Sequence, residues 1–269
     1  MSDRRPLLVV ATAALVLAAL YVGRTAAGDV SLYRDFLTDA TLVRGAAVCK
    51  LALLAFACVH ATQTFRRLEP GNDARSPWLL LALALGGFTL GQSILSSHQL
   101  VFAKSPFPSP ADALFIAAYP LLLASFVRFG RAYRRSGLPV GKLWQHLAIA
   151  ASVLVAGALV AGPLLRPVLA APGTRLEHAL NVAYPAFDLA LLIPLAILVR
   201  IAWPFRGGAI FRAWALLLAG TVGMCAGDLL FAWFSMMDAS HLDPLVHGSY
   251  LVAYACLAWG TRLHRDLVG

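Results

Sequence analysis

Charged residues are scarce in this chain. Only 13% of its 269 residues are charged and 60% are hydrophobic, whereas a soluble domain of this length would carry about twice that charged fraction. Long apolar runs recur along the whole length, which excludes a globular domain with one anchor. We therefore predict an all-α, polytopic membrane helix bundle, with residues 1–269 forming one transmembrane domain.

Motifs for metal binding and common catalysis are also missing. The four cysteines all lie in apolar runs and form no C-x-x-C pair, so neither a disulfide framework nor a zinc site is expected. There is no H-E-x-x-H, G-x-S-x-G or phosphate-binding loop. His241, Asp243 and His247 could gather a metal, but loop or interfacial histidines are the more common explanation. We predict no metal and no cofactor.

Eight apolar runs come near the roughly 20 residues that a bilayer requires. The predicted spans are 6–22, 42–65, 77–97, 111–129, 143–165, 179–201, 210–236 and 245–263. The first run has a basic start and small residues near Ala27, as a secretory signal would. Its apolar stretch is long for a signal peptide, so we favour a retained first helix.

The net charge of +9 fits this arrangement. In a soluble protein it would suggest a nucleic-acid partner, but here it indicates the Lys/Arg bias that orients membrane helices. With eight spans, one side collects Arg4, Arg5, Arg66, Arg67, Arg75, Arg128, Arg131, Arg134, Arg135, Lys142, Arg200, Arg206, Arg212, Arg262 and Arg265. This places both termini in the cytoplasm, predicts a multi-pass protein of the bacterial inner membrane with the lipid bilayer as partner, and argues against nucleic acid.

The fourth span begins with Pro-Ser-Pro-Ala-Asp. Ser109 is placed to cap a helix that starts at Pro110, and Asp112 three positions later completes a capping box. A cap explains Asp112 better than a ligand does. Pro120 lies inside that helix, and Pro185 and Pro194 lie inside the sixth. Each proline frees a backbone carbonyl and is expected to kink its helix.

Two hairpins resemble each other and suggest an internal repeat. The first runs from Trp78 through Gly91-Gln92 to Ala118-Tyr119. The second runs from Trp214 through Gly227-Asp228 to Ala253-Tyr254, and the intervals match to within a residue.

Polar residues inside the spans are the strongest functional signal, because an unpaired ionisable group costs on the order of 3 kcal/mol at mid-membrane. Their similar depth predicts one polar cavity that opens outward, with Lys50 neutralising Asp188 or Asp228. The predicted ligand-binding residues are Lys50, Gln92, Asp188, Asp228, His247, Tyr250 and Tyr254. The alternative is a buried ion pair and a protonated acid that only hold the bundle in register.

The segments Pro106–Leu123, Ala183–Arg200 and Gly227–Trp233 together resemble the N-terminal membrane region of bacterial GGDEF and EAL signalling proteins, which make and degrade cyclic di-GMP. The resemblance covers about residues 78–265 and implies a sensor that precedes a cytoplasmic catalytic module. This sequence contains no such module. The resemblance therefore implies sensing of an unknown small molecule or lipid and signalling to a separate cytoplasmic protein, with enzymatic activity as the less expected alternative.

A second resemblance, carried by Lys50 and Gly227-Asp228, is to the lysoplasmalogenase family of membrane lipid hydrolases. It implies Asp188 and Asp228 as the catalytic acid and base, although Gln92 stands where that family has an acid. A third possibility is a structural subunit of a membrane complex. The Ala- and Gly-rich segment Ala148–Gly162 would allow close helix packing within the bundle or in a homodimer.

Overall fold

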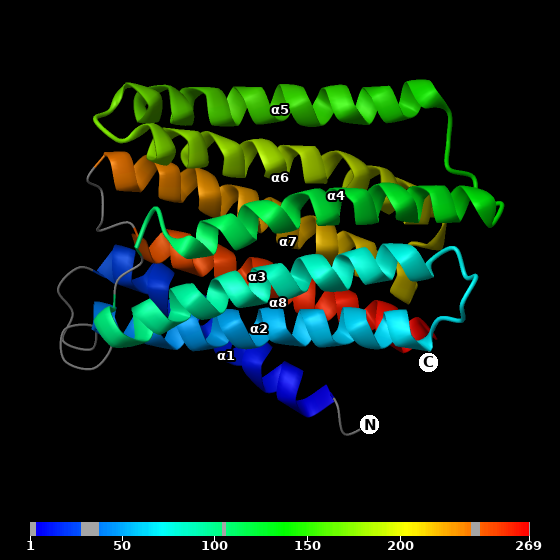
Figure 1. Cartoon of the computed structure of the whole chain (residues 1–269), viewed down its shortest axis with the longest axis horizontal. Coiled ribbons are helices and arrows are strands. Elements are labelled where there is room, and N and C mark those ends of the chain that lie inside the picture. The colour runs from blue at the N-terminus through cyan, green and yellow to red at the C-terminus, as the bar shows by residue number, and fades with distance from the viewer. Residues whose placement is uncertain (1–3, 28–37, 104–105, 238–242, 269) are drawn as a thin grey trace.

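The computed structural model describes residues 4–27, 38–103, 106–237 and 243–268, and these residues form an all-helical bundle (Figure 1). The described part contains eight α-helices and one short 3-10 helix. They are α1 (Arg4–Ala27), α2 (Asp39–Arg67), α3 (Arg75–Phe102), α4 (Pro110–Arg135), α5 (Leu143–Ala170), α6 (Arg175–Ala202), η2 (Trp203–Phe205), α7 (Ala209–Met236) and α8 (Asp243–Val268).

Each predicted span falls within one of these helices. In the described residues seven helices, α1 to α7, are long and apolar enough to cross a membrane. α8 has 26 residues but is not among the seven, since its polar side chains lower its hydropathy. It contacts α1, α2 and α7, so much of its surface faces protein, where polar groups are tolerated better than in lipid.

Six helices pack in a closed ring. α2 contacts α3, α3 contacts α4, α4 contacts α6, α6 contacts α7, α7 contacts α8, and α8 returns to α2. α1 packs outside the ring on α2 and α8, and α5 packs outside it on α6 and α7. In Figure 1 these two helices form opposite edges of the bundle. The ring therefore encloses the interior in which the polar residues meet.

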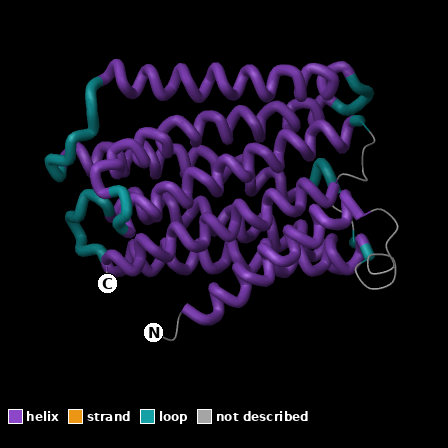
Figure 2. The backbone as a smooth tube through the Cα atoms, turned by 180° about the vertical axis from the view of Figure 1, so that it is seen from behind, coloured by secondary structure: helices purple, strands orange, loops and turns teal. Residues whose placement is uncertain are grey.

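Consecutive helices run in opposite directions, so that the start of α1 and the end of α8 lie at the same end of the bundle (Figures 1 and 2). We call this the terminal end, and the other the distal end. The arginines of the loops between α2 and α3, α4 and α5, and α6 and α7 belong to the terminal end. The charge asymmetry read from the sequence is thus an asymmetry between the two ends of the bundle.

Local sequence signals fix the distal helix starts. Thr38 caps α2 by accepting a hydrogen bond from the backbone N–H of Thr41. Thr174 and Glu177 form a capping box at the start of α6, satisfying backbone N–H groups that a helix start leaves without partners. The three prolines predicted to bend helices lie inside α4 and α6 as expected: Pro120, Pro185 and Pro194.

Candidate functional site

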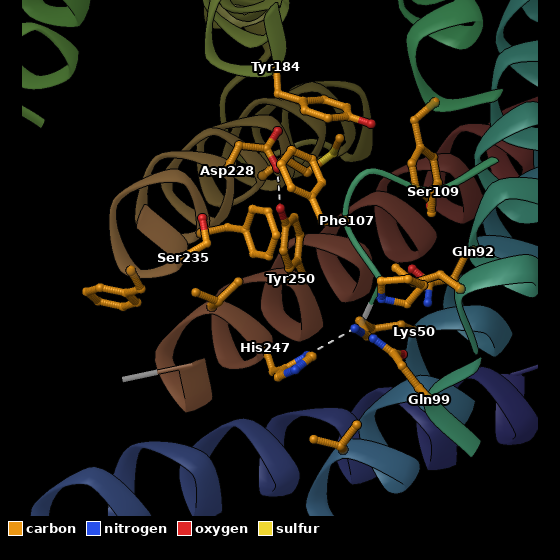
Figure 3. Close-up of a pocket in the computed structure, with 18 of the residues that line it drawn as sticks. Lys50, Gln92, Gln99, Phe107, Ser109, Tyr184, Asp228, Ser235, His247 and Tyr250 are labelled. Carbon is orange, nitrogen blue, oxygen red and sulfur yellow. Dashed lines mark hydrogen bonds between the residues drawn. The ribbon is translucent and has the colours of Figure 1, made fainter. Parts of the chain in front are cut away.

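A cavity of about 1020 Å³ lies within the distal half of the bundle. Residues at the distal helix ends line it, among them Arg24, Asp39 and Glu177, and its inner wall is formed by Phe88, Met224 and other buried side chains. Six of the seven predicted ligand-binding residues line it: Lys50, Gln92, Asp228, His247, Tyr250 and Tyr254. They come from α2, α3, α7 and α8, which the ring of helices brings together (Figure 3).

Asp228 is held on the cavity wall by two tyrosines. The Tyr250 hydroxyl donates to Asp228 Oδ1 in a short hydrogen bond, and the Tyr119 hydroxyl lies 3.4 Å from Asp228 Oδ2. Tyr119 also donates to Asp188 Oδ1 at 2.9 Å. One hydroxyl thus lies between two carboxyl groups on different helices. Two ionised carboxylates this close would repel each other in a low-dielectric interior, so the pair requires a shared proton or a cation.

Asp188, predicted as a ligand-binding residue, lies outside the cavity lining. Its side chain is 0% exposed. The Tyr119 side chain, which stacks on Phe187 at 5.2 Å between ring centroids, lines the cavity in its place. Of the two acids, Asp228 therefore lines the cavity, and Asp188 is joined to its wall by the hydrogen bond from Tyr119.

Lys50 contacts a histidine rather than either of these acids. Its Nζ atom lies 3.1 Å from His247 Nδ1, and among the described residues no salt bridge joins it to a carboxylate. The Tyr250 ring lies between Lys50 and Asp228. The Lys50 ammonium is 5.9 Å from the ring centroid, and the hydroxyl of the same ring donates a hydrogen bond to Asp228. Tyr250 therefore separates the base from the acid, as Figure 3 shows.

Gln92 is anchored towards α2 rather than towards the acids. Its Nε2 donates to Ser96 Oγ at 2.9 Å, and Ser96 donates to the backbone carbonyl of Ala47 at 3.1 Å. The amide is 2% exposed and keeps its place on the cavity wall through this chain of bonds. Gln92 thus contributes a polar surface to the cavity that is fixed by the packing of α2 on α3.

Asp112 forms the predicted cap of α4 and also bonds to a tyrosine of α6. Its Oδ2 accepts from the backbone N–H of Ser109 at 2.5 Å, and its Oδ1 accepts from the Tyr184 hydroxyl at 2.6 Å. Ser109, Asp112 and Tyr184 all line the cavity. The start of α4 is therefore joined to α6 at the rim of the site.

Three residues of the site were missed as polar partners: Tyr21, Tyr119 and Tyr184. The sequence marks Tyr119 only through its match with Tyr254 in the two similar hairpins. Tyr21 stacks on the His247 ring at 5.5 Å between centroids. It lies on α1, which resembles a secretory signal in sequence. Tyrosines are common in membrane helices. These three differ from others in the side chains that they contact on other helices, and the sequence alone does not show those contacts.

Metal binding finds no support in the part of the chain that the structure describes, where no group of three or more His, Cys, Asp or Glu side chains is placed to hold an ion. His241 and the side chain of Asp243, considered above with His247, lie outside the described residues.

Comparison with protein-family models, curated proteins and solved structures found no match to this chain. The two family resemblances read from the sequence therefore stay predictions, and function has to be argued from the geometry of the cavity.

Proposed function

We propose that this protein is an integral membrane receptor that binds a small molecule or lipid in the distal cavity and relays its occupancy to the terminal end. The observation that carries the proposal is the cavity itself. It is large enough for a drug-sized ligand, it is surrounded by six packed helices, and polar side chains from all six line it.

The orientation of the receptor follows from the placement of Lys and Arg. All eight helices cross the membrane in this proposal, with α8 shielded by its neighbours. The terminal end carries most of the arginines, as cytoplasmic loops do. The cavity then opens towards the outside of a bacterial inner membrane, and a separate signalling protein reads the cytoplasmic end.

α8 supplies a physical link between the two ends. Its distal half carries His247 and Tyr250 in the cavity wall, and its terminal half carries His264, whose ring packs edge-on against Trp78 at 5.2 Å and Trp214 at 4.6 Å. These tryptophans belong to α3 and α7. A ligand that shifts α8 against either helix would change the packing of this aromatic cluster, which is the differential contact that signalling needs.

Lipid hydrolysis by a pair of acids fits the geometry less well. A mechanism in which one carboxyl protonates the substrate and the other activates water requires both to reach it. Asp188 is fully buried behind Tyr119, which leaves Asp228 as the one acid of the pair with access. The arrangement favours binding over hydrolysis.

Native mass spectrometry of the protein purified in a mild detergent tests the proposal. We expect a defined adduct on the wild type and at least a tenfold weaker one on Asp228→Asn, because this change disturbs the cavity wall. Asp73→Asn is the matched control: Asp73 pairs with Arg135 at the terminal end, and its adduct should equal that of the wild type.

Relay to the terminal end has its own readout. Hydrogen exchange of the segment 258–268 should differ between adduct-bearing and delipidated protein. Adduct-free spectra from well-folded wild type would count against a receptor, and an adduct whose removal leaves this exchange unchanged would indicate binding without relay.

A further inference from the structure

Lys50 is a buried cation without a matching acid in the described structure. Its side chain enters the bundle from α2, about eleven residues from the distal start of that helix, and the residue is 3% exposed. Its hydrogen bond goes to a histidine. A buried charge that is neither paired nor solvated is costly, and in a membrane such residues mark ligand or ion sites.

The acids of the cavity are engaged elsewhere. Both oxygens of Asp228 face tyrosine hydroxyls. Both oxygens of Asp112 accept hydrogen bonds from Ser109 and Tyr184. At the mouth, Asp39 pairs with Arg24 at 3.2 Å, and Glu177 accepts from the backbone of its own helix start.

A further hydroxyl group lies next to His247, the residue that contacts Lys50. The Tyr21 ring stacks on His247, the hydrogen-bond partner of Lys50. Its hydroxyl is buried and has no hydrogen-bond partner among the described residues, yet Tyr21 lines the cavity. An ammonium and an unused hydroxyl on two side chains that both contact His247 are groups that an anion would bind.

The rest of the wall is largely apolar. Phe88, Leu95, Phe115, Met224, Phe231 and Phe234 line the same cavity. Phe88 and Phe115 pack against each other at 5.7 Å between centroids, so these two rings form one aromatic part of the wall. Such a wall suits an aliphatic chain or a flat apolar body rather than a small hydrated ion.

We propose that the ligand is an anionic amphiphile whose phosphate or carboxylate group binds Lys50 and Tyr21, while its apolar part lies along the aromatic wall. This inference rests on the proposed receptor function and names the chemical class of its ligand. Binding places a negative charge next to the unmatched ammonium, and the apolar wall adds the burial energy of the chain.

Four probes separate the parts of this proposal in native mass spectrometry with the protein in dodecyl maltoside. Dodecyl phosphate has the proposed charge and chain, dodecyltrimethylammonium has the chain with the opposite charge, and butyl phosphate and inorganic phosphate have the charge with little or no chain. We expect adducts of dodecyl phosphate at concentrations at least tenfold lower than for the other three.

Substitutions then locate the binding group. Lys50→Met should weaken the dodecyl phosphate adduct at least tenfold, Tyr21→Phe by about threefold, and Lys50→Arg should retain most of it. Lys142→Met, which removes an exposed cation at the terminal end, is the matched control and should have no effect. The thermal midpoint of ligand-free Lys50→Met should rise, because an uncompensated charge leaves the interior; a purely structural lysine would lower it.

The outcomes distinguish this inference from the function on which it rests. Equal binding of dodecyltrimethylammonium, or binding unaffected by Lys50→Met, would overturn the anionic ligand while leaving a receptor in place. Equal binding of butyl or inorganic phosphate would replace the amphiphile by a soluble anion. If no probe binds and the folded wild type also purifies without an adduct, the receptor function itself fails. Should Lys50→Met not fold, Tyr21→Phe and Lys50→Arg still decide the question.

Discussion

The hairpins α3–α4 and α7–α8 are packed alike but carry different chemistry. A Cβ atom added to Gly87 would lie 3.3 Å from the Ala118 Cβ, and one added to Gly223 would lie 3.1 Å from the Ala253 Cβ. These four residues occupy corresponding positions in the sequence match between the hairpins. The two helix pairs therefore approach each other closely at the same place.

One turn further along, a second pair of glycines shows the same correspondence. An added Cβ would come within 2.6 Å of the Phe115 ring at Gly91, and within 3.0 Å of the Tyr250 ring at Gly227. In both hairpins a glycine receives an aromatic ring four residues before the matched Tyr119 or Tyr254. The packing is common to both hairpins, and the ring differs by one hydroxyl.

The two hairpins differ in their polar side chains. In α7–α8 the additional hydroxyl of Tyr250 meets Asp228; in α3–α4 the ring is Phe115, and Gln92 turns to Ser96 instead. Close helix packing is thus common to both hairpins, and two side-chain differences determine which hairpin holds an acid at the cavity. The internal repeat suggested by the sequence stays a prediction, and matching glycine contacts are what support it.

The closest approach of a glycine to backbone in these two hairpins belongs to the second. A Cβ at Gly220 would lie 2.9 Å from the backbone carbonyl oxygen of Ala253, whereas the corresponding position in α3 is already an alanine, Ala84. Gly220→Ala should therefore lower the free energy of unfolding by about 3 kcal/mol, since backbone has to move. Equilibrium unfolding in detergent with added dodecyl sulfate measures the change.

Gly162 provides the control, because nothing lies within 4 Å of a Cβ added there. Gly162→Ala should be neutral or stabilise by up to about 1 kcal/mol through helix propensity. Equal effects of the two changes would mean that α7 and α8 are not as close as the structure has them.

Substitution of the matched residues Tyr119 and Tyr254 by phenylalanine should lower the free energy of unfolding by unequal amounts. Tyr119→Phe removes the hydroxyl that lies between Asp188 and Asp228, and should lower the free energy of unfolding by about 2 kcal/mol because two buried carboxyl groups lose a donor. Tyr254→Phe should cost less than about 0.5 kcal/mol, as no hydrogen bond of its hydroxyl is seen among the described residues. A larger loss at Tyr254 than at Tyr119 in the same unfolding experiment would contradict the acid pair.

Helix positions could be predicted well from the sequence, and side-chain partners could not. Apolar runs and caps such as Ser109 depend on neighbours in the chain, so all eight spans fell on helices. Whether Lys50 meets Asp228 or His247 depends on the rotation of α2 and α8 about their axes and on the ring of Tyr250 between them. Similar depth along the helices predicted a common cavity but could not show that Asp188 lies behind Tyr119.

The smallest effect tests the repeat most directly, through a double-mutant cycle in the first hairpin. Gln92→Asp alone should destabilise the protein, because it breaks the bond to Ser96 and leaves a buried acid without a donor. Phe115→Tyr alone should change little, since the ring lines the cavity and its new hydroxyl can be hydrated. If the hairpins are equivalent, the two changes together recreate the bond that Tyr250 makes to Asp228. The double variant should then be more stable than the sum of the single effects by about 1 kcal/mol. A coupling of zero would mean that the two glycine contacts are similar without placing the neighbouring side chains in the same relation, and the repeat would be limited to helix packing.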